Sequence, residues 1–222
     1  MTIGHAKNTL ERNKMIKNII FDFDGVILDS MPIRTDAFAY ALREYPSHLV
    51  NKLIEYHLYH GGLSRFHKFQ HFFDNLLHQE LSEEKMQMLL ADFSSFIKDK
   101  LTDKSLLIKD TIDYIINNHK KQQFFIASGS EQEELRHICH SLDIDHFFIG
   151  IFGSPTHKTT IVANIIQNHS LSHKETVMIG DSINDLEAAK SNHINFFGYN
   201  NPELKSTQGY GGYLDNFNDI HL

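Results

Sequence analysis

The spacing of apolar residues changes twice along the chain. Ile19, Ile20, Phe21 and Phe23 form an almost continuous apolar run, which is typical of a strand buried on both faces of a sheet. From residue 31 to about residue 105, apolar residues recur at helical spacing. Beyond that point short apolar runs alternate with helical segments, a pattern that indicates a parallel sheet covered by helices on both faces.

The helical region directly follows the first predicted strand. It carries two apolar stripes, one formed by Phe66, Phe69, Phe73 and Leu76, the other by Met86, Leu89 or Leu90, Phe93 and Phe96 or Ile97. A stripe of this kind on a helix faces a core. We therefore expect residues 31–105 to form a small helical bundle inserted into an α/β domain.

The alternating region predicts helices and strands in turn. They are a helix near 108–119, a strand over 123–128, a helix over 131–141, a strand over 147–153, a helix over 159–169, a strand over 176–180, a helix over 185–191 and a strand over 194–199. The predicted fold class is α/β, with a doubly wound, Rossmann-like parallel-sheet core and an inserted helical domain. The tail from residue 200 is expected to add a short strand or a terminal helix.

Polar residues stand where four predicted strands end. Asp22 and Asp24 follow the first strand, Ser128 and Gly129 the second, Lys158 the third, and Asp181, with Asp185 four residues later, the fourth. Ligands of open α/β sheets bind at the carboxyl ends of the strands, so these residues are expected to share one rim. If the strand is still extended there, positions i and i+2 put Asp22 and Asp24 on the same side.

Three of these residues, Asp22, Asp24 and Asp181, are carboxylates that need compensation, because an unpaired buried charge is costly. Lys158 is the cation nearest to them in the motifs. Hard oxygen ligands of this kind suit Mg²⁺. The sequence therefore predicts a magnesium site in which the ion supplies the missing positive charge.

Two further features indicate an anion beside that ion. Ser130, with Glu133 three residues later, has the pattern of a capping box, so the Ser128–Gly129 region is expected to present amide donors at a helix N-terminus. Lys158 falls in the first turn of a predicted helix, where the helix dipole disfavours a cation, and this placement is typical of a lysine that meets an anion. Together these features favour phosphoryl transfer.

The composition of the chain limits which functional classes and cellular compartments fit it. The formal net charge is −7 and no cluster of Lys and Arg occurs, which argues against a general nucleic-acid binder. Cys139 is the single cysteine, so no intrachain disulfide can form and a reducing cytosol is the expected compartment. No apolar run approaches the roughly 20 residues that span a bilayer, so we expect no membrane partner. Residues 1–14 lack the apolar region of a secretory signal and are expected to form a flexible extension.

Four motifs together resemble one protein family. DFDGVILDS at 22–30, IASGS at 126–130, Lys158 within GSPTHK and GDSINDLEAA at 180–189 are similar, in this order, to the motifs of the haloacid dehalogenase superfamily of phosphatases and phosphomutases. The inserted helices resemble the C1-type cap of phosphoglycolate phosphatase and β-phosphoglucomutase relatives. The resemblance implies a core domain of residues 15–30 and 106–222 with a cap of residues 31–105.

The resemblance also implies roles for the first pair of aspartates. Asp22 would be the nucleophile that forms an aspartyl phosphate. Asp24 would protonate the leaving oxygen and later take a proton from water, a role that a neighbouring carboxylate favours by raising the pKa.

The other motif residues would bind the ion and the phosphoryl group. The resemblance implies that Mg²⁺ is held by Asp22, the backbone carbonyl of Asp24 and Asp181, while Asp185 orients a bound water or Lys158. Ser128, Gly129 and Lys158 would bind the transferring phosphoryl group. In the cap, HGGLSRFHKF at 60–69 resembles the loop that reaches toward the active site, and it makes Arg65, with Lys68, a candidate for binding a second charged group of the substrate.

The leading hypothesis is a Mg²⁺-dependent phosphatase that acts on a small phosphorylated metabolite as a monomer or weak dimer. The nearest rival is a phosphomutase, which returns the phosphoryl group to a sugar. A phosphonate hydrolase would need a cap lysine, Lys52 or Lys68, that forms a Schiff base, and dehalogenation is disfavoured by the presence of Asp24. From other classes, a receiver-type signalling module is disfavoured by the inserted helices, and a catalytically silent binding protein stays open although no motif residue is missing.

Overall fold

The computed structural model describes residues 16–206 and 212–217, so the extension predicted for residues 1–14 lies outside the described residues. Among the described residues six strands occur: β1 (Asn18–Phe21), β2 (Gln123–Glu131), β3 (Gly150–Ser154), β4 (Thr176–Gly180), β5 (Asn195–Tyr199) and β6 (Gly212–Leu214). They form one parallel sheet in the order β3-β2-β1-β4-β5-β6. This is the predicted α/β, Rossmann-like fold, and β6 supplies the extra strand expected in the tail.

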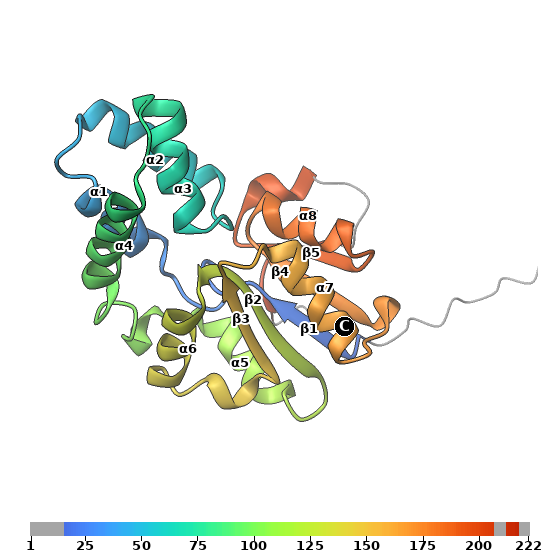
Figure 1. The fold of residues 1–222 in the computed structure, drawn as a ribbon. Helices are drawn as coiled ribbons and strands as arrows, with labels where there is room; N and C mark the ends of the chain where they lie inside the picture. Colours follow the sequence, from blue (N-terminus) through green and yellow to red (C-terminus); the bar gives the residue numbers. More distant parts are fainter. Residues whose placement is uncertain (1–15, 207–211, 218–222) are drawn as a thin grey trace, which may run out of the picture.

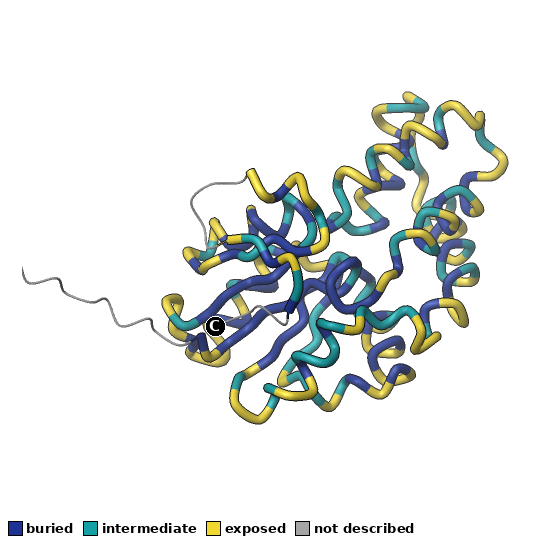
Figure 2. Tube along the Cα trace, turned by 180° about the vertical axis from the view of Figure 1, so that it is seen from behind, coloured by how far each residue is buried: buried dark blue, intermediate teal, exposed yellow. Residues whose placement is uncertain are grey.

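Helices cover both faces of the sheet (Figure 1). They are α5 (Lys109–Asn118), α6 (Gln132–Ser141), α7 (Lys158–Asn168) and α8 (Ile183–Ser191). The side chains of β1 alternate between two apolar clusters, because Ile19 and Phe21 join the cluster that includes α5 and α6, whereas Ile20 joins the cluster that includes α7 and α8. The central strand is therefore buried on both faces, as its uninterrupted apolar run indicates (Figure 2).

Four further helices lie between β1 and β2 in the chain and form a group beside the sheet (Figure 1). They are α1 (Met31–Ala41), α2 (Ser47–Tyr59), α3 (Arg65–His71), which continues into a π-helical segment (Phe72–Leu77), and α4 (Glu83–Ile97). The two predicted stripes do face a common core. Phe69, Phe73, Leu89, Leu90, Phe93 and Ile97 are buried, and Phe66, Leu76, Met86 and Phe96 pack against them partly buried.

Two predicted strand boundaries differ from the structure by three residues. The apolar residues before β3 form a 3-10 turn (Asp145–Phe147), so that strand starts at Gly150 and not at 147. The second strand runs to Glu131 rather than to residue 128, and its pairing with β3 shifts register after Ala127. Among the described residues, no helix combines the length and apolar character needed to cross a bilayer.

Candidate active site

The carboxyl end of β1 begins the site. The Asp22 amide still donates to the Ile179 carbonyl on β4 at 2.9 Å, so Asp22 extends the strand by one residue. The chain then turns through Gly25, whose φ of +78° is a left-handed conformation. A Cβ at Gly25 would lie 2.0 Å from Oδ2 of Asp181. The turn therefore needs glycine twice, for its φ and for the close approach of that carboxylate.

Three carboxylates gather at this rim. Asp22, Asp181 and Asp185 each offer an oxygen, and these oxygens lie within 4.8 Å of one another. Lys158 Nζ lies 2.9 Å from Asp22 Oδ1 and 2.6 Å from Asp185 Oδ1. The topology thus brings together residues that follow three different strands, as the strand-end pattern predicts.

The electrostatics of this cluster show a shortage of positive charge. Burial, together with the charge of Asp185, raises the pKa of Asp22 from 3.8 to about 7, although Lys158 opposes the shift. Burial and the charge of Asp22 likewise raise the pKa of Asp181 well above its usual value. One ammonium group does not balance three carboxylates. The atoms that could bind a metal ion here are carboxylate oxygens, which are hard ligands. These residues therefore fit a divalent cation such as Mg²⁺.

Lys158 is the first residue of α7, as the sequence predicts, and it is buried. Burial disfavours its charge, but Asp185 and Asp22 outweigh that cost and raise its pKa. Asp185 is fixed in turn by α8, since its Oδ2 accepts from the amide and from the hydroxyl of Ser182, at 3.0 and 2.6 Å. The lysine is therefore held as a cation beside Asp22.

Asp24 does not join the acidic cluster, because its convergence with Asp22 requires an extended chain and the chain is not extended after Asp22. Its Oδ1 accepts from Arg34 Nε at 2.6 Å and from the Ser30 hydroxyl, and its Oδ2 accepts from the Ser130 hydroxyl at 2.6 Å. The physical reason is local, because the chain leaves the extended path directly after Asp22 and turns at Gly25.

The pKa of Asp24 also departs from the expectation. Burial disfavours its charge, but the Arg34 guanidinium and the hydrogen bonds from Ser130 and Ser30 outweigh burial and lower the pKa. A guanidinium group, not a carboxylate, is the dominant charged neighbour. In the arrangement described here Asp24 is therefore ionised, and the prediction that a neighbouring carboxylate raises its pKa is wrong.

The strand end around Ser128 differs from its prediction as well. Ser130 does not cap α6. The cap is Glu131, whose carboxylate accepts from the amides of Glu133 and Glu134 at 3.1 and 2.8 Å. Ser128 is fully buried, and its hydroxyl oxygen accepts from the Ser130 amide at 3.0 Å. The hydroxyl of Ser130 can therefore donate its hydrogen bond to Asp24.

A loop between α2 and α3 covers the site. A Cβ at Gly129 would lie 2.5 Å from the carbonyl oxygen of Gly62, and a Cβ at Gly62 would lie 3.3 Å from Lys158 Nζ. The inserted helices thus approach the core main chain to main chain, directly above the lysine. Any side chain at Gly129 would push this loop away.

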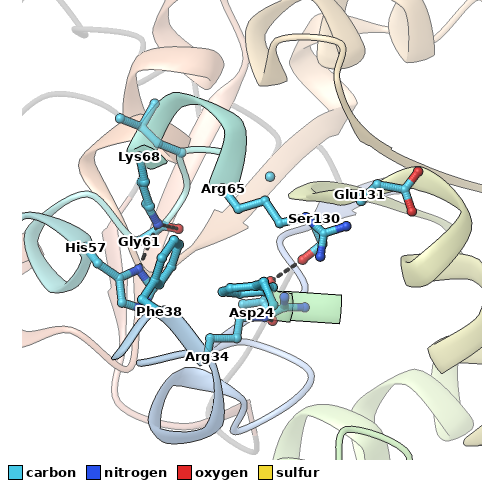
Figure 3. A pocket seen from close by; sticks show the side chains of 12 residues that line it. Asp24, Arg34, Phe38, His57, Gly61, Arg65, Lys68, Ser130 and Glu131 are labelled. Carbon is cyan, nitrogen blue, oxygen red and sulfur yellow. Dashed lines mark hydrogen bonds and ion pairs between the residues drawn. The ribbon is translucent and has the colours of Figure 1, made fainter. Parts of the chain in front are cut away.

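The inserted helices also bring cations to the site (Figure 3). Arg65 Nη1 lies 2.7 Å from Glu134 Oε2, and Arg34 Nη1 lies 3.4 Å from Glu134 Oε1. Lys68 Nζ lies 2.8 Å from His57 Nδ1 and donates to the Gly61 carbonyl at 3.2 Å. Sequence reasoning named Arg65 and Lys68 but missed Arg34, His57 and Glu134, which belong to no motif and meet only through helix packing.

Known proteins resemble this chain in sequence pattern and in fold. The model of the haloacid dehalogenase-like hydrolase family matches residues 19–199. No curated protein sequence matches the chain significantly.

Among solved structures, the chain is similar to β-phosphoglucomutase from Clostridium difficile, with a TM-score of 0.75 and 16% identity over 93% of each chain. It is similar to a predicted phosphoglycolate phosphatase from Haemophilus somnus 129pt, with a TM-score of 0.70 and 19% identity over 93% of this chain and 97% of the other. It also resembles a predicted phosphatase from Clostridium acetobutylicum, with a TM-score of 0.73 and 16% identity over 94% and 97% of the two chains. At these identities the likeness establishes a shared fold.

Proposed function

Because the chain belongs to the haloacid dehalogenase-like hydrolase family, we propose that it is a Mg²⁺-dependent phosphatase that hydrolyses a small phosphorylated metabolite through an aspartyl phosphate. The observation that carries the proposal is the pairing of Asp22 with Lys158 at 2.9 Å inside a buried acidic cluster. A nucleophile, a cation for the phosphoryl oxygens and a set of oxygen ligands occur within one site.

Asp22 attacks phosphorus in the proposed first step, and the bond from phosphorus to the leaving oxygen breaks. Lys158 and the Ser128–Gly129 segment bind the phosphoryl oxygens and stabilise their charge. In the second step water attacks phosphorus and the bond to Asp22 breaks, which returns the free carboxylate.

Asp24 is the proposed general acid and base. It gives a proton to the leaving oxygen and later takes one from the attacking water. Its contact with Arg34 favours the ionised form. We therefore propose that this contact loosens in the reacting complex, so that the carboxyl group can hold a proton.

The metal ligands in this proposal are Asp22, Asp181 and the backbone carbonyl of Asp24, with Asp185 orienting Lys158 through their 2.6 Å contact or a bound water. When bound, Mg²⁺ would neutralise charge on the carboxylates and on the phosphoryl oxygens. The carboxylate of Asp24 is not a ligand in this arrangement, since Arg34 and two serines occupy it.

The proposal includes a division of labour along the chain. Residues 15–30 and 106–222 form the core domain, and residues 31–105 form a cap that closes over it. Arg65 of the cap is proposed to contact the substrate, since it lines a cavity beside Asp24. The partner is a small phosphorylated metabolite, and the single cysteine fits a reducing cytoplasm. A monomer or weak dimer is the proposed assembly.

A phosphomutase is the second candidate, because the fold is shared with a β-phosphoglucomutase. The two reactions differ in whether water or a sugar hydroxyl receives the phosphoryl group. A mutase would need a sugar bisphosphate for turnover and would release little inorganic phosphate.

The decisive experiment is a panel of phosphorylated metabolites with Mg²⁺, read by release of inorganic phosphate. We expect Asp22→Asn to lower turnover by about 10³-fold or more, because the variant lacks the nucleophile. Asp29→Asn is the matched control, since Asp29 lies in the same motif but is exposed, and it should stay within about twofold of the native rate. Turnover that survives in Asp22→Asn would contradict the assignment.

A further inference from the structure

A small cavity lies between the inserted helices and the core. Its volume is about 30 Å³, room for a water or two or for one compact group. The inserted helices contribute Arg34, His57, Arg65 and Lys68, and Asp24 borders the cavity on the core side (Figure 3). In the proposed reaction Asp24 protonates the leaving oxygen, so the cavity stands where the leaving group departs.

Among the residues that the structure describes, three buried donor atoms of this cavity have no hydrogen-bond partner. They are Nη2 of Arg34, Nε of Arg65 and Nε2 of His57, on side chains that are 6%, 9% and 1% exposed. A buried donor without a partner costs about 1–3 kcal/mol. Three in one small space indicate that a ligand supplies the acceptors.

The hydrogen on His57 can be placed by its contact with Lys68. An ammonium group has donors only, so Nδ1 of His57 accepts from Lys68 Nζ at 2.8 Å. Burial and the charges of Lys68 and Arg34 lower the pKa of His57 to about 2, so the ring is neutral and carries its hydrogen on Nε2. His57 is therefore a third fixed donor beside the two guanidinium groups.

The carboxylates around the cavity are already occupied. Both oxygens of Asp24 accept hydrogen bonds, and Glu134 gives one oxygen to Arg34 and the other to Arg65. Glu131 also lines the cavity, and its two oxygens accept from backbone amides at the start of α6. Within the described residues, Lys68 Nζ has two hydrogen-bond partners, His57 and the Gly61 carbonyl, and lies over the Phe38 ring, while no carboxylate forms an ion pair with it. The side chain is 2% exposed. Burial lowers its pKa from 10.5 to about 7. The cavity thus has surplus donors and one buried cation without a carboxylate against it.

We propose that this cavity binds a carboxylate on the leaving group, so that the substrate is the phosphate ester of a small hydroxy acid. The inference rests on the proposed phosphatase function and names the class of substrate for it. Two carboxylate oxygens offer four lone-pair sites, enough for Arg34, Arg65, His57 and Lys68. The negative charge also compensates Lys68.

Other leaving groups fit less well. A neutral hydroxyl group would satisfy one or two donors and leave the Lys68 ammonium uncompensated. A second phosphoryl group carries three terminal oxygens and a charge of about −1.5 to −2, which exceeds both the room and the single unpaired cation. Size and charge together select the carboxylate.

A matched pair of esters tests the proposal on the full-length protein with Mg²⁺. The pair is 2-phosphoglycolate and 2-hydroxyethyl phosphate, which differ only in a carboxylate or a hydroxymethyl group on the same short leaving group. We expect kcat/KM to be about tenfold or more higher for the acid, since charge-assisted hydrogen bonds contribute about 1.5–3 kcal/mol each.

Variants assign this preference to the cavity. Lys68→Met should remove it, because kcat/KM for the acid should fall by about tenfold more than kcat/KM for the alcohol, mainly through a higher KM for the acid. Lys52→Met is the matched control, because Lys52 lies exposed on α2, and it should leave the preference unchanged. If Lys68→Met does not fold, His57→Phe removes one donor of the cavity together with the acceptor of Lys68, retains an aromatic ring against Phe38, whose centroid is 4.8 Å away, and should also reduce the preference for the acid.

Binding without turnover separates this inference from the proposed function. The rise in melting temperature of Asp22→Asn is measured with each ester, and a larger rise with the acid supports the inference even if no ester is hydrolysed. Equal binding of the two esters, or equal losses for both in Lys68→Met, would overturn the carboxylate site. Hydrolysis of both esters at the same Asp22-dependent rate would overturn it while leaving the phosphatase proposal intact.

Discussion

The rim of the sheet and the cavity of the inserted helices differ in the sign of the charge they lack. At the rim, Asp22, Asp181 and Asp185 surround the single cation Lys158. In the cavity both oxygens of the Asp24 carboxylate already accept hydrogen bonds, whereas three buried donors have no partner among the described residues. The rim has too little positive charge and suits a cation, whereas the cavity has unpaired donors and suits an anion.

Asp24 lies where these two halves meet. It follows the same strand as Asp22, yet its carboxylate contacts Arg34 of the inserted helices. In the proposed reaction, the proton that the leaving group needs is therefore controlled from the side of the inserted helices, whereas the nucleophile is controlled from the side of the sheet. The contrast between the rim and the cavity can be tested by substitutions in one of the two regions and measurements that report on the other.

Removal of metal should have the largest effect, because it leaves the rim without compensation. We expect chelation to lower turnover by more than about 10²-fold and addition of Mg²⁺ to raise the melting temperature. Burial raises the pKa of Asp22 from 3.8 to about 7 in the metal-free fold, so ionising it costs stability fully above about pH 7 and not at all below about pH 4. The ion removes this cost and must displace a proton at low pH. The shift should therefore be larger at pH 8 than at pH 5.5.

The control for this experiment is Asp181→Asn, which should bind Mg²⁺ weakly and show little shift at either pH. Differential scanning calorimetry with and without the ion gives the measurement. An equal shift for the native protein at pH 5.5 and pH 8 would show that the rim carboxylates are not short of positive charge.

Replacement of Arg34 should have an intermediate effect on activity. It should change the protonation of Asp24 and leave the carboxylates at the rim unaffected. The guanidinium lowers the pKa of Asp24 against the effect of burial, so Arg34→Gln should raise that pKa and keep the general acid protonated to higher pH. For 2-hydroxyethyl phosphate the alkaline limb of the kcat profile should move up by about one pH unit. With p-nitrophenyl phosphate, whose leaving group needs no proton, the limb should stay in place. Identical profiles for the two enzymes on both esters would remove Arg34 from the control of Asp24.

In the protein without substrate, replacement of Lys68 should have the smallest of these effects, and that effect is on stability. Burial lowers its pKa from 10.5 to about 7, so the cost of keeping the charge is fully present below pH 7 and disappears as pH rises through 10.5. Lys68→Met should therefore raise the free energy of unfolding by about 1–3 kcal/mol at pH 6, and by less at pH 10. Urea denaturation at both pH values measures it, with Lys52→Met expected to change nothing. A variant less stable than the native protein at pH 6 would mean that the buried charge is not a cost.

The residues at the rim could be predicted from the sequence because the ends of parallel strands lie at the same edge of a sheet. Asp22, Lys158 and Asp181 each follow a strand, and the carboxyl ends of parallel strands meet whatever the angle of the surrounding helices. The same alternation rule failed for Asp24, since it assumes an extended chain and the turn at Gly25 breaks that assumption. Ser130 was misread because Glu131, one residue later, competes for the same amides and wins.

The cavity could not be predicted in this way. Arg34, His57, Lys68 and Glu134 come from four different helices, and their contacts depend on how those helices pack. Nothing in the spacing of the sequence states a packing angle. Only the loop around Arg65 carries a local pattern, which is why Arg65 and Lys68 were named and their partners were not.

The seating of the loop on the core has a consequence for how such a protein can diversify. Gly62 meets Gly129 through a carbonyl oxygen and an α-carbon, so the fit depends on main-chain atoms and on the absence of a side chain at Gly129, and not on the side chains that line the cavity. Mutations that alter the chemistry of the neighbouring chamber leave this seat intact. Substrate selectivity and closure of the loop over the site therefore depend on different atoms. Evolution can change the substrate through the cavity side chains while the contact between the loop and the core is retained.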